Sequence, residues 1–173
     1  MIAVSGIQPE HEQTLECLYP KTSLAVWLVV ILGLGSSMAL YFGPGLWFEN
    51  LTKPTWNPPS WVLVPVWMLS YALMAISAWL IRRDNVAPRS EVLSAMGLFG
   101  LQFALNLAWA PLFFGLQQPA LAFLEISLLW LVALWTALSF GKISSTAGYF
   151  LAPYLCWLSF ALVLNGTIWL LNS

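Results

Sequence analysis

Five apolar stretches, each long enough to cross a membrane, dominate this chain of 173 residues and leave little freedom in how it can fold. They cover residues 22–43, 61–81, 92–114, 120–140 and 147–171. A helix needs about 20 apolar residues to cross the hydrocarbon core of a bilayer. Inside lipid every backbone polar group must find its partner within the protein, and short connections force neighbouring helices to be antiparallel. We therefore predict an all-α integral membrane bundle of five transmembrane helices.

Composition supports this class and excludes others. Hydrophobic residues make up 60% of the chain and charged residues 8%, whereas soluble domains carry about 25% charged residues. The net charge is −1 and no basic run exceeds Arg82-Arg83, so nucleic acid is not an expected partner. With one histidine and two distant cysteines, no metal site is expected. Residues 1–21 are polar and acidic, and we assign them to a tail before a membrane domain that covers 22–173.

The basic residues predict an orientation. Five spans place most of them on the N-terminal side of the membrane, and only Lys53 falls on the other side. The residues on the N-terminal side are Lys21, Arg82, Arg83, Arg89 and Lys142. Because positive charge favours the cytoplasmic side, we expect a cytoplasmic N-terminus and place the connector between the first two spans on the opposite side.

That connector carries the most unusual segment of the chain. Residues 53–67, KPTWNPPSWVLVPVW, contain four prolines and three tryptophans. Proline fixes φ and lacks a backbone donor, which keeps the connector out of helix and makes it stiff. Trp56 and Trp61 combine an apolar ring with a polar N–H, as is typical of residues where hydrocarbon meets water. We call residues 44–60 the lid and expect a rigid aromatic cap at the membrane surface.

Polar and aromatic side chains recur on single faces of two spans. On the third span the spacing is i, i+4 and i+7, and on the fifth it is i, i+4 and i+8, so each set shares a helix face. The first set is Gln102, Asn106 and Trp109, and the second is Trp157, Ala161 and Asn165. Antiparallel threading brings both sets under the lid and predicts a ligand pocket roofed by Trp56 and Trp61. The predicted binding residues are Trp56, Trp61, Trp67, Tyr71, Asn106, Trp109, Glu125, Trp157, Ala161 and Asn165.

A simpler interpretation of the same residues remains open. Amide side chains in membrane helices often hydrogen-bond a neighbouring helix and contribute about 0.6 to 2 kcal/mol each without binding a ligand. Tryptophans in such helices often only fill space. Convergence under one lid favours the pocket, because ligand sites are mostly apolar with a few polar groups.

Glu125 is the only acidic residue well inside a span, where an ionisable group is costly enough to indicate a function. Its own helix offers no basic partner. Lys53 in the lid is the nearest candidate for an ion pair. Alternatively, Glu125 is protonated and hydrogen-bonded.

The third span also carries small residues at intervals of four. Gly100, Ala104 and Ala108 form a seam that allows helices to approach closely. The seam fits either a dimer contact or packing within the bundle.

Three segments together resemble the TspO/translocator protein family, also called tryptophan-rich sensory proteins or peripheral benzodiazepine receptors. They are KPTWNPPSW with PVWMLSY, LQFALNLAWAPLFFG, and PYLCWLSFALVLN. The resemblance implies a five-helix membrane protein, usually a homodimer, that binds porphyrins such as protoporphyrin IX. Some members also bind sterols and synthetic isoquinoline carboxamide or benzodiazepine ligands. By motif, the family's pocket residues fall on Trp67, Asn106, Trp109, Trp157 and Ala161.

The last span departs from the family's sterol-recognition pattern, because Gly166, Thr167 and Leu170 stand where that pattern has tyrosines and an arginine. Cholesterol is therefore not an expected ligand. Apart from Cys156, no histidine or cysteine near the pocket is placed as an axial ligand, so metal-free porphyrin should bind at least as readily as haem. No cofactor is required.

Three functions follow from these features. The first is a receptor, transport or sensory protein for a porphyrin. The second is an enzyme that promotes light- and oxygen-dependent porphyrin breakdown, with Trp67 and Trp157 as the candidate residues and the chemistry supplied by the excited ligand. The third is a membrane scaffold without a small ligand.

Overall fold

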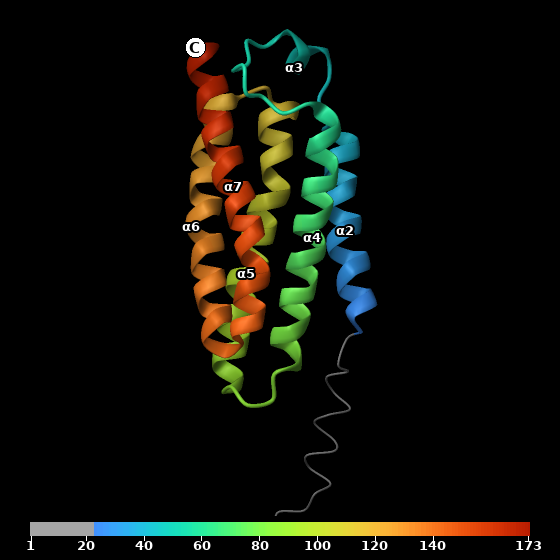
Figure 1. The fold of residues 1–173 in the computed structure, drawn as a ribbon, viewed down its shortest axis with the longest axis vertical. Helices are drawn as coiled ribbons and strands as arrows, with labels where there is room; N and C mark the ends of the chain where they lie inside the picture. The colour runs from blue at the N-terminus through green and yellow to red at the C-terminus, as the bar shows by residue number, and fades with distance from the viewer. Residues whose placement is uncertain (1–22) are drawn as a thin grey trace, which may run out of the picture.

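The computed structural model describes residues 23–173 and is built from helices (Figure 1). Five of the helices are long and apolar enough to span a membrane, with 18 to 27 residues each, which confirms the predicted five-helix bundle. They are α2 (Leu24–Tyr41), α4 (Ser60–Arg83), α5 (Arg89–Ala110), α6 (Pro119–Ile143) and α7 (Ser145–Leu171). The predicted tail, residues 1–21, lies outside the described residues. The chain is thus a multi-pass integral membrane protein.

Helices that follow one another along the chain run antiparallel, and the five form a closed ring in which only α2 and α5 are parallel neighbours (Figure 1). The strongest contacts join α2 to α4, α4 to α7, α7 to α6 and α6 to α5, and weaker contacts between α5 and α2 close the ring. The lid lies at one end of this bundle, together with the C-terminus and the connection from α5 to α6. The connections from α4 to α5 and from α6 to α7 lie at the opposite end.

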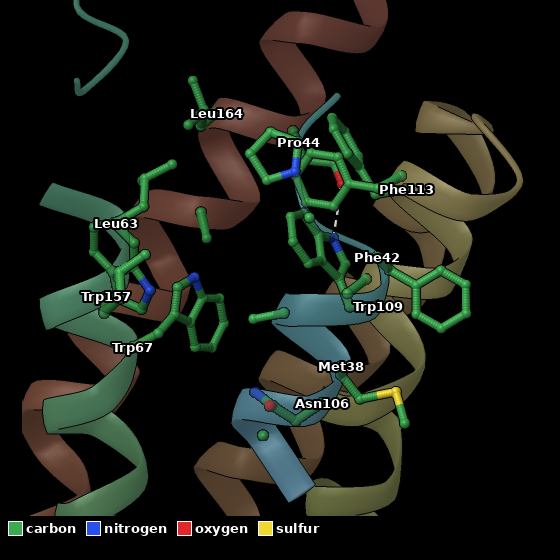
Figure 2. Close-up of a pocket in the computed structure, with 18 of the residues that line it drawn as sticks. Met38, Phe42, Pro44, Leu63, Trp67, Asn106, Trp109, Phe113, Trp157 and Leu164 are labelled. Carbon is green, nitrogen blue, oxygen red and sulfur yellow. Dashed lines mark hydrogen bonds between the residues drawn. The ribbon is translucent and has the colours of Figure 1, made fainter. Parts of the chain in front are cut away.

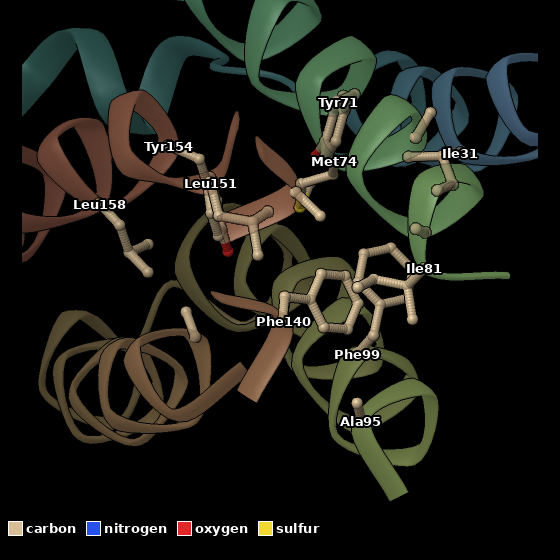
Figure 3. Packing of buried hydrophobic residues seen from close by; sticks show 14 of the residues in the cluster. Ile31, Tyr71, Met74, Ile81, Ala95, Phe99, Phe140, Leu151, Tyr154 and Leu158 are labelled. Carbon is tan, nitrogen blue, oxygen red and sulfur yellow. The ribbon is translucent and has the colours of Figure 1, made fainter. Parts of the chain in front are cut away.

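Most fully buried side chains lie in the half of the bundle away from the lid. Figure 3 shows Phe99 from α5 and Phe140 from α6 in this core, and their rings stack at 5.8 Å between centroids. A buried hydrogen bond of 2.7 Å from the Ser77 hydroxyl to the Ala147 carbonyl ties α4 to α7. Because this half is filled by the protein's own side chains, the space for a ligand lies in the other half.

The helix widens after the end of α5, where the next turn begins at a proline. Pro111 has no backbone N–H and so cannot donate an α-helical hydrogen bond, and residues Pro111–Gly115 form a short π-helix, η1. The Leu116 N–H closes this turn on the Pro111 carbonyl at 2.8 Å. The turn stacks the ring of Phe113 on that of Trp109 at 5.1 Å. The sequence pattern predicts a plain helix here. Proline alone does not explain the difference, because α4 and α7 continue as α-helices through Pro65 and Pro153.

The lid is non-helical over residues 51–59, as its prolines predict, but it also contains an unpredicted short helix, α3 (Leu46–Asn50). Phe48 of α3 is buried against Phe113 and Phe114, with ring centroids 6.1 and 5.4 Å away. Lys53 donates to the Glu49 and Leu51 carbonyls at 2.9 and 3.1 Å and so satisfies groups at the end of α3.

A glycine allows α2 to pack directly on α4. A Cβ atom at Gly35 would overlap the ring of Tyr71, which is only 7% exposed. Gly35→Ala should therefore lower the stability of the protein in detergent micelles by about 1 to 3 kcal/mol, as overpacking does in other cores. Thermal unfolding of the purified protein measures this loss.

Gly33→Ala is the matched control, because a Cβ at Gly33 of the same helix meets nothing within 4 Å. This change should leave stability unaltered or raise it by up to about 1 kcal/mol through helix propensity. Equal unfolding temperatures for the two variants would contradict the close contact of α2 with α4.

Candidate functional site

A cavity of about 170 Å³ lies under the lid, between α2, α4, α5 and α7 (Figure 2). Its walls are mainly aromatic and aliphatic. Seven of the residues predicted for the pocket line it: Trp67, Tyr71, Asn106, Trp109, Trp157, Ala161 and Asn165. The antiparallel arrangement therefore brings residues from α4, α5 and α7 together, although ligand binding itself stays a prediction.

Trp67 of α4 is the centre of the aromatic wall. Its ring lies 6.1 Å from Trp157 on α7, edge to face, and 6.3 Å from Trp109 on α5. It also stacks on Tyr71, one helical turn away, at 5.8 Å. Aromatic pairs in these geometries attract each other beyond simple burial, so the indoles of three helices form one connected wall.

Hydrogen bonds hold the far side of the cavity in place. The Trp109 indole N–H donates to Asn165 Oδ1 at 3.1 Å, and Asn165 Nδ2 donates to the Pro119 carbonyl at 2.9 Å. This chain links α5, α7 and α6. Both polar groups of Asn165 are used within the protein, so this residue acts as the helix-joining amide of the simpler interpretation.

Two polar atoms at the cavity have no partner among the described residues. The indole Nε1 of Trp157 is buried and unpartnered, and so is Oδ1 of Asn106. The other half of the Asn106 amide, Nδ2, donates to the Tyr154 hydroxyl at 3.2 Å, which fixes the side chain. Leaving a buried donor or acceptor unpaired costs about 1 to 3 kcal/mol.

The structure does not bring the two predicted roof tryptophans to the cavity. Trp61 is 76% exposed at the start of α4, and Trp56 is half exposed and packs its ring on Phe160 at 5.8 Å. The connection between α2 and α4 contributes Gly43, Pro44, Phe48 and Asn57 to the cavity lining instead. Helix periodicity cannot predict which lid side chains turn inward, because the path of the connector is set by its prolines and by α3.

Glu125 also lies outside the cavity lining, and neither of the two alternatives for its carboxyl group, an ion pair with Lys53 or a hydrogen bond, is found among the described residues. Both of its carboxyl oxygens are buried without a hydrogen-bond partner among the described residues. Lys53 donates to lid carbonyls and lies over the Phe48 ring at 4.7 Å.

Sequence patterns miss the contribution of the first span. The cavity lining includes three residues of α2 and the residue that follows its C-terminal end: Gly35, Met38, Ala39 and Phe42. These residues are apolar or small and do not differ in type from the rest of the span, so no signal marks them. Phe113 and Phe114, which follow Pro111, are missed for the same reason.

Comparisons with known proteins agree with this architecture. The model of the TspO/MBR family matches residues 23–170. The chain is 36% identical over 150 residues to the tryptophan-rich protein TspO of Chlorobaculum tepidum, covering 87% of this chain and 94% of the relative. It is 39% identical over 143 residues to the translocator protein of Sus scrofa, covering 82% and 85%. It is 35% identical over 122 residues to the tryptophan-rich sensory protein of Cereibacter sphaeroides, covering 70% and 74%.

Proposed function

Because this chain belongs to the TspO/MBR family, we propose that it is a membrane receptor, transport or sensory protein that binds a porphyrin such as protoporphyrin IX in the cavity under the lid. Relatives named translocator protein and tryptophan-rich sensory protein support a receptor or sensory role. The observation that carries the proposal is the cavity wall formed by Trp67, Trp109 and Trp157.

The chemistry of this wall suits a flat, conjugated guest. Indole faces stack on a macrocycle and contribute attraction beyond the burial of apolar area. The unpartnered Trp157 Nε1 supplies a donor, and the unpartnered Asn106 Oδ1 supplies an acceptor. A metal-free porphyrin carries both pyrrole N–H donors and carboxylate acceptors, so it matches an apolar pocket with few polar groups.

Filling the cavity from α7 tests the proposal. Ala161 lines the cavity and is 7% exposed, so the larger side chain of Ala161→Phe would occupy space that the ligand needs. We expect the affinity for protoporphyrin IX to fall at least about tenfold, or 1.4 kcal/mol. Titration of the purified protein with protoporphyrin IX, followed by quenching of tryptophan fluorescence, measures the affinity.

Ala152→Phe makes the same change at an exposed position of the same helix and should bind as the unmodified protein does. An identical titration for both variants and the unmodified chain would rule out the cavity as the site. In that case the scaffold without a small ligand becomes the better interpretation.

A second candidate function is the light- and oxygen-dependent breakdown of the bound porphyrin. The contact of Trp67 with Trp157 at 6.1 Å favours it, because two oxidisable rings then lie in one cavity wall. The excited porphyrin and dioxygen would supply the chemistry, and the protein would supply orientation.

Illumination in air separates this enzyme from a binding protein. If the protein promotes breakdown, the absorption bands of protoporphyrin IX should decay faster with the unmodified chain than with the double variant Trp67→Phe/Trp157→Phe. Trp135→Phe is the control, because it removes an indole that is 63% exposed on α6. With this variant the porphyrin bands should decay as fast as with the unmodified chain. Equal decay for all three proteins would remove the enzymatic candidate.

We also propose that the lid faces away from the cytoplasm. Arg82, Arg83, Arg89 and Lys142 lie at the end of the bundle opposite the lid (Figure 1), which follows the positive-inside bias. The exposed Thr55, changed to cysteine in a chain whose own cysteines are replaced by serine, should react with an impermeant thiol reagent on intact cells. Reaction only after permeabilisation would show that the lid faces the cytoplasm.

The small residues of α5 support the proposal of a homodimer. Gly100 and Ala104 are exposed, and a Cβ at Gly100 would meet nothing within 4 Å. The seam with Ala108 therefore faces outward, where a second copy can approach closely. Crosslinking in vesicles should capture a dimer that Gly100→Phe abolishes, and a dimer unaffected by this change would place the contact elsewhere.

A further inference from the structure

Three residues that line the cavity are also exposed on the protein surface. They are Ala39 near the end of α2, Pro44 at the start of the lid, and Val64 in the first turns of α4, whose side chain is 59% exposed. We call these three residues the mouth. Ala39 and Val64 belong to candidate membrane spans, so the mouth opens sideways between the lid-side ends of two spans.

Below the mouth the same pair of helices is closed. Gly35 allows α2 to lie directly on the Tyr71 ring, and the Ser36 hydroxyl reaches the Met68 sulfur at 3.7 Å. The opening is therefore confined to the lid-side ends of α2 and α4, near the depth of the membrane interface.

One side chain ties the lid to the C-terminal end of α7. The Thr52 N–H donates to Asn172 Oδ1 at 2.9 Å, and Asn172 Nδ2 donates to the Thr52 carbonyl at 2.9 Å and to the Ile168 carbonyl at 2.7 Å. These bonds fasten the lid to the end of α7, 120 residues away in sequence. We call this arrangement the latch.

Aromatic packing fastens the other side of the lid. The rings of Trp47 and Phe48 lie 5.8 and 6.1 Å from Phe113 of η1. Opening the lid would break both this packing and the latch, whereas entry through the mouth breaks neither.

We propose that the ligand enters and leaves sideways through the mouth, from the bilayer, while the lid stays latched. The class of ligand that can use such an entrance is a flat, apolar molecule that dissolves in the membrane and keeps its polar edge at the interface. This inference rests on the proposed function, because it assigns the route to the same cavity.

The cavity is too small to enclose a porphyrin completely, as expected if one side is open. Its volume of about 170 Å³ is below the roughly 300 to 1,000 Å³ of sites that enclose a drug-sized ligand. A porphyrin held against Trp67 and Trp157 would therefore extend through the mouth into the surrounding lipid. A route that stays partly open needs no movement of the lid.

Rate constants distinguish the two routes. The full chain is reconstituted in phosphatidylcholine vesicles and mixed rapidly with protoporphyrin IX, and quenching of tryptophan fluorescence gives the association and dissociation rate constants. Val64→Phe and Ala39→Phe narrow the mouth from its two helices without adding an indole. Leu69→Phe is the matched control, since Leu69 is 57% exposed on α4 but does not line the cavity. Asn172→Ala releases the latch.

If the mouth is the entrance, each mouth variant should slow association by about tenfold, which is within the range seen among related complexes. Leu69→Phe and Asn172→Ala should keep the rates of the unmodified chain. Unaltered rates in both mouth variants, or faster rates in Asn172→Ala, would overturn the lateral route. Absence of quenching with the unmodified chain would instead overturn the proposed function.

Discussion

The hydrogen-bonded chain from Trp109 through Asn165 to the Pro119 carbonyl is the interaction on which the cavity depends. Lipid offers no competing donors or acceptors, so these groups have partners only within the protein. The chain fixes the lid-side ends of α5, α7 and α6 and holds the Trp109 ring at the cavity wall. With that wall fixed, the side chains cannot collapse into the space next to Trp67.

The two halves of the bundle differ in how they are packed. Away from the lid, Phe99, Phe140 and their neighbours fill the interior and keep the helices at fixed positions. Near the lid, α2 contacts α4 at Gly35 and Ser36, and closer to the lid the cavity lining includes residues that are exposed on the surface. A filled half therefore supports a hollow half, and Asn172 ties the lid to the end of α7.

The sequence predicts the fold well because the constraint that produces it is simple. Five apolar runs can only be five spans, and their ends in the structure differ by a few residues. Two local features escape prediction, α3 and the π-turn at Pro111, since short segments gain their stability from tertiary contacts such as Phe48 on Phe113. The site is predictable where helix periodicity places Asn106 and Trp109 or Trp157 and Ala161. It is not predictable where the lid directs Trp61 outward, or where Met38 and Ala39 carry no distinguishing side chain.

A structure of the protein with protoporphyrin IX bound in a bilayer mimetic tests the central claim most directly. We predict that part of the macrocycle lies against Trp67, Trp109 and Trp157, that its polar groups reach Trp157 Nε1 and Asn106 Oδ1, and that the rest extends toward Ala39 and Val64. A porphyrin found only on the outer surface, with the cavity filled by the protein's own side chains and Trp67 and Trp157 turned toward lipid, would contradict it.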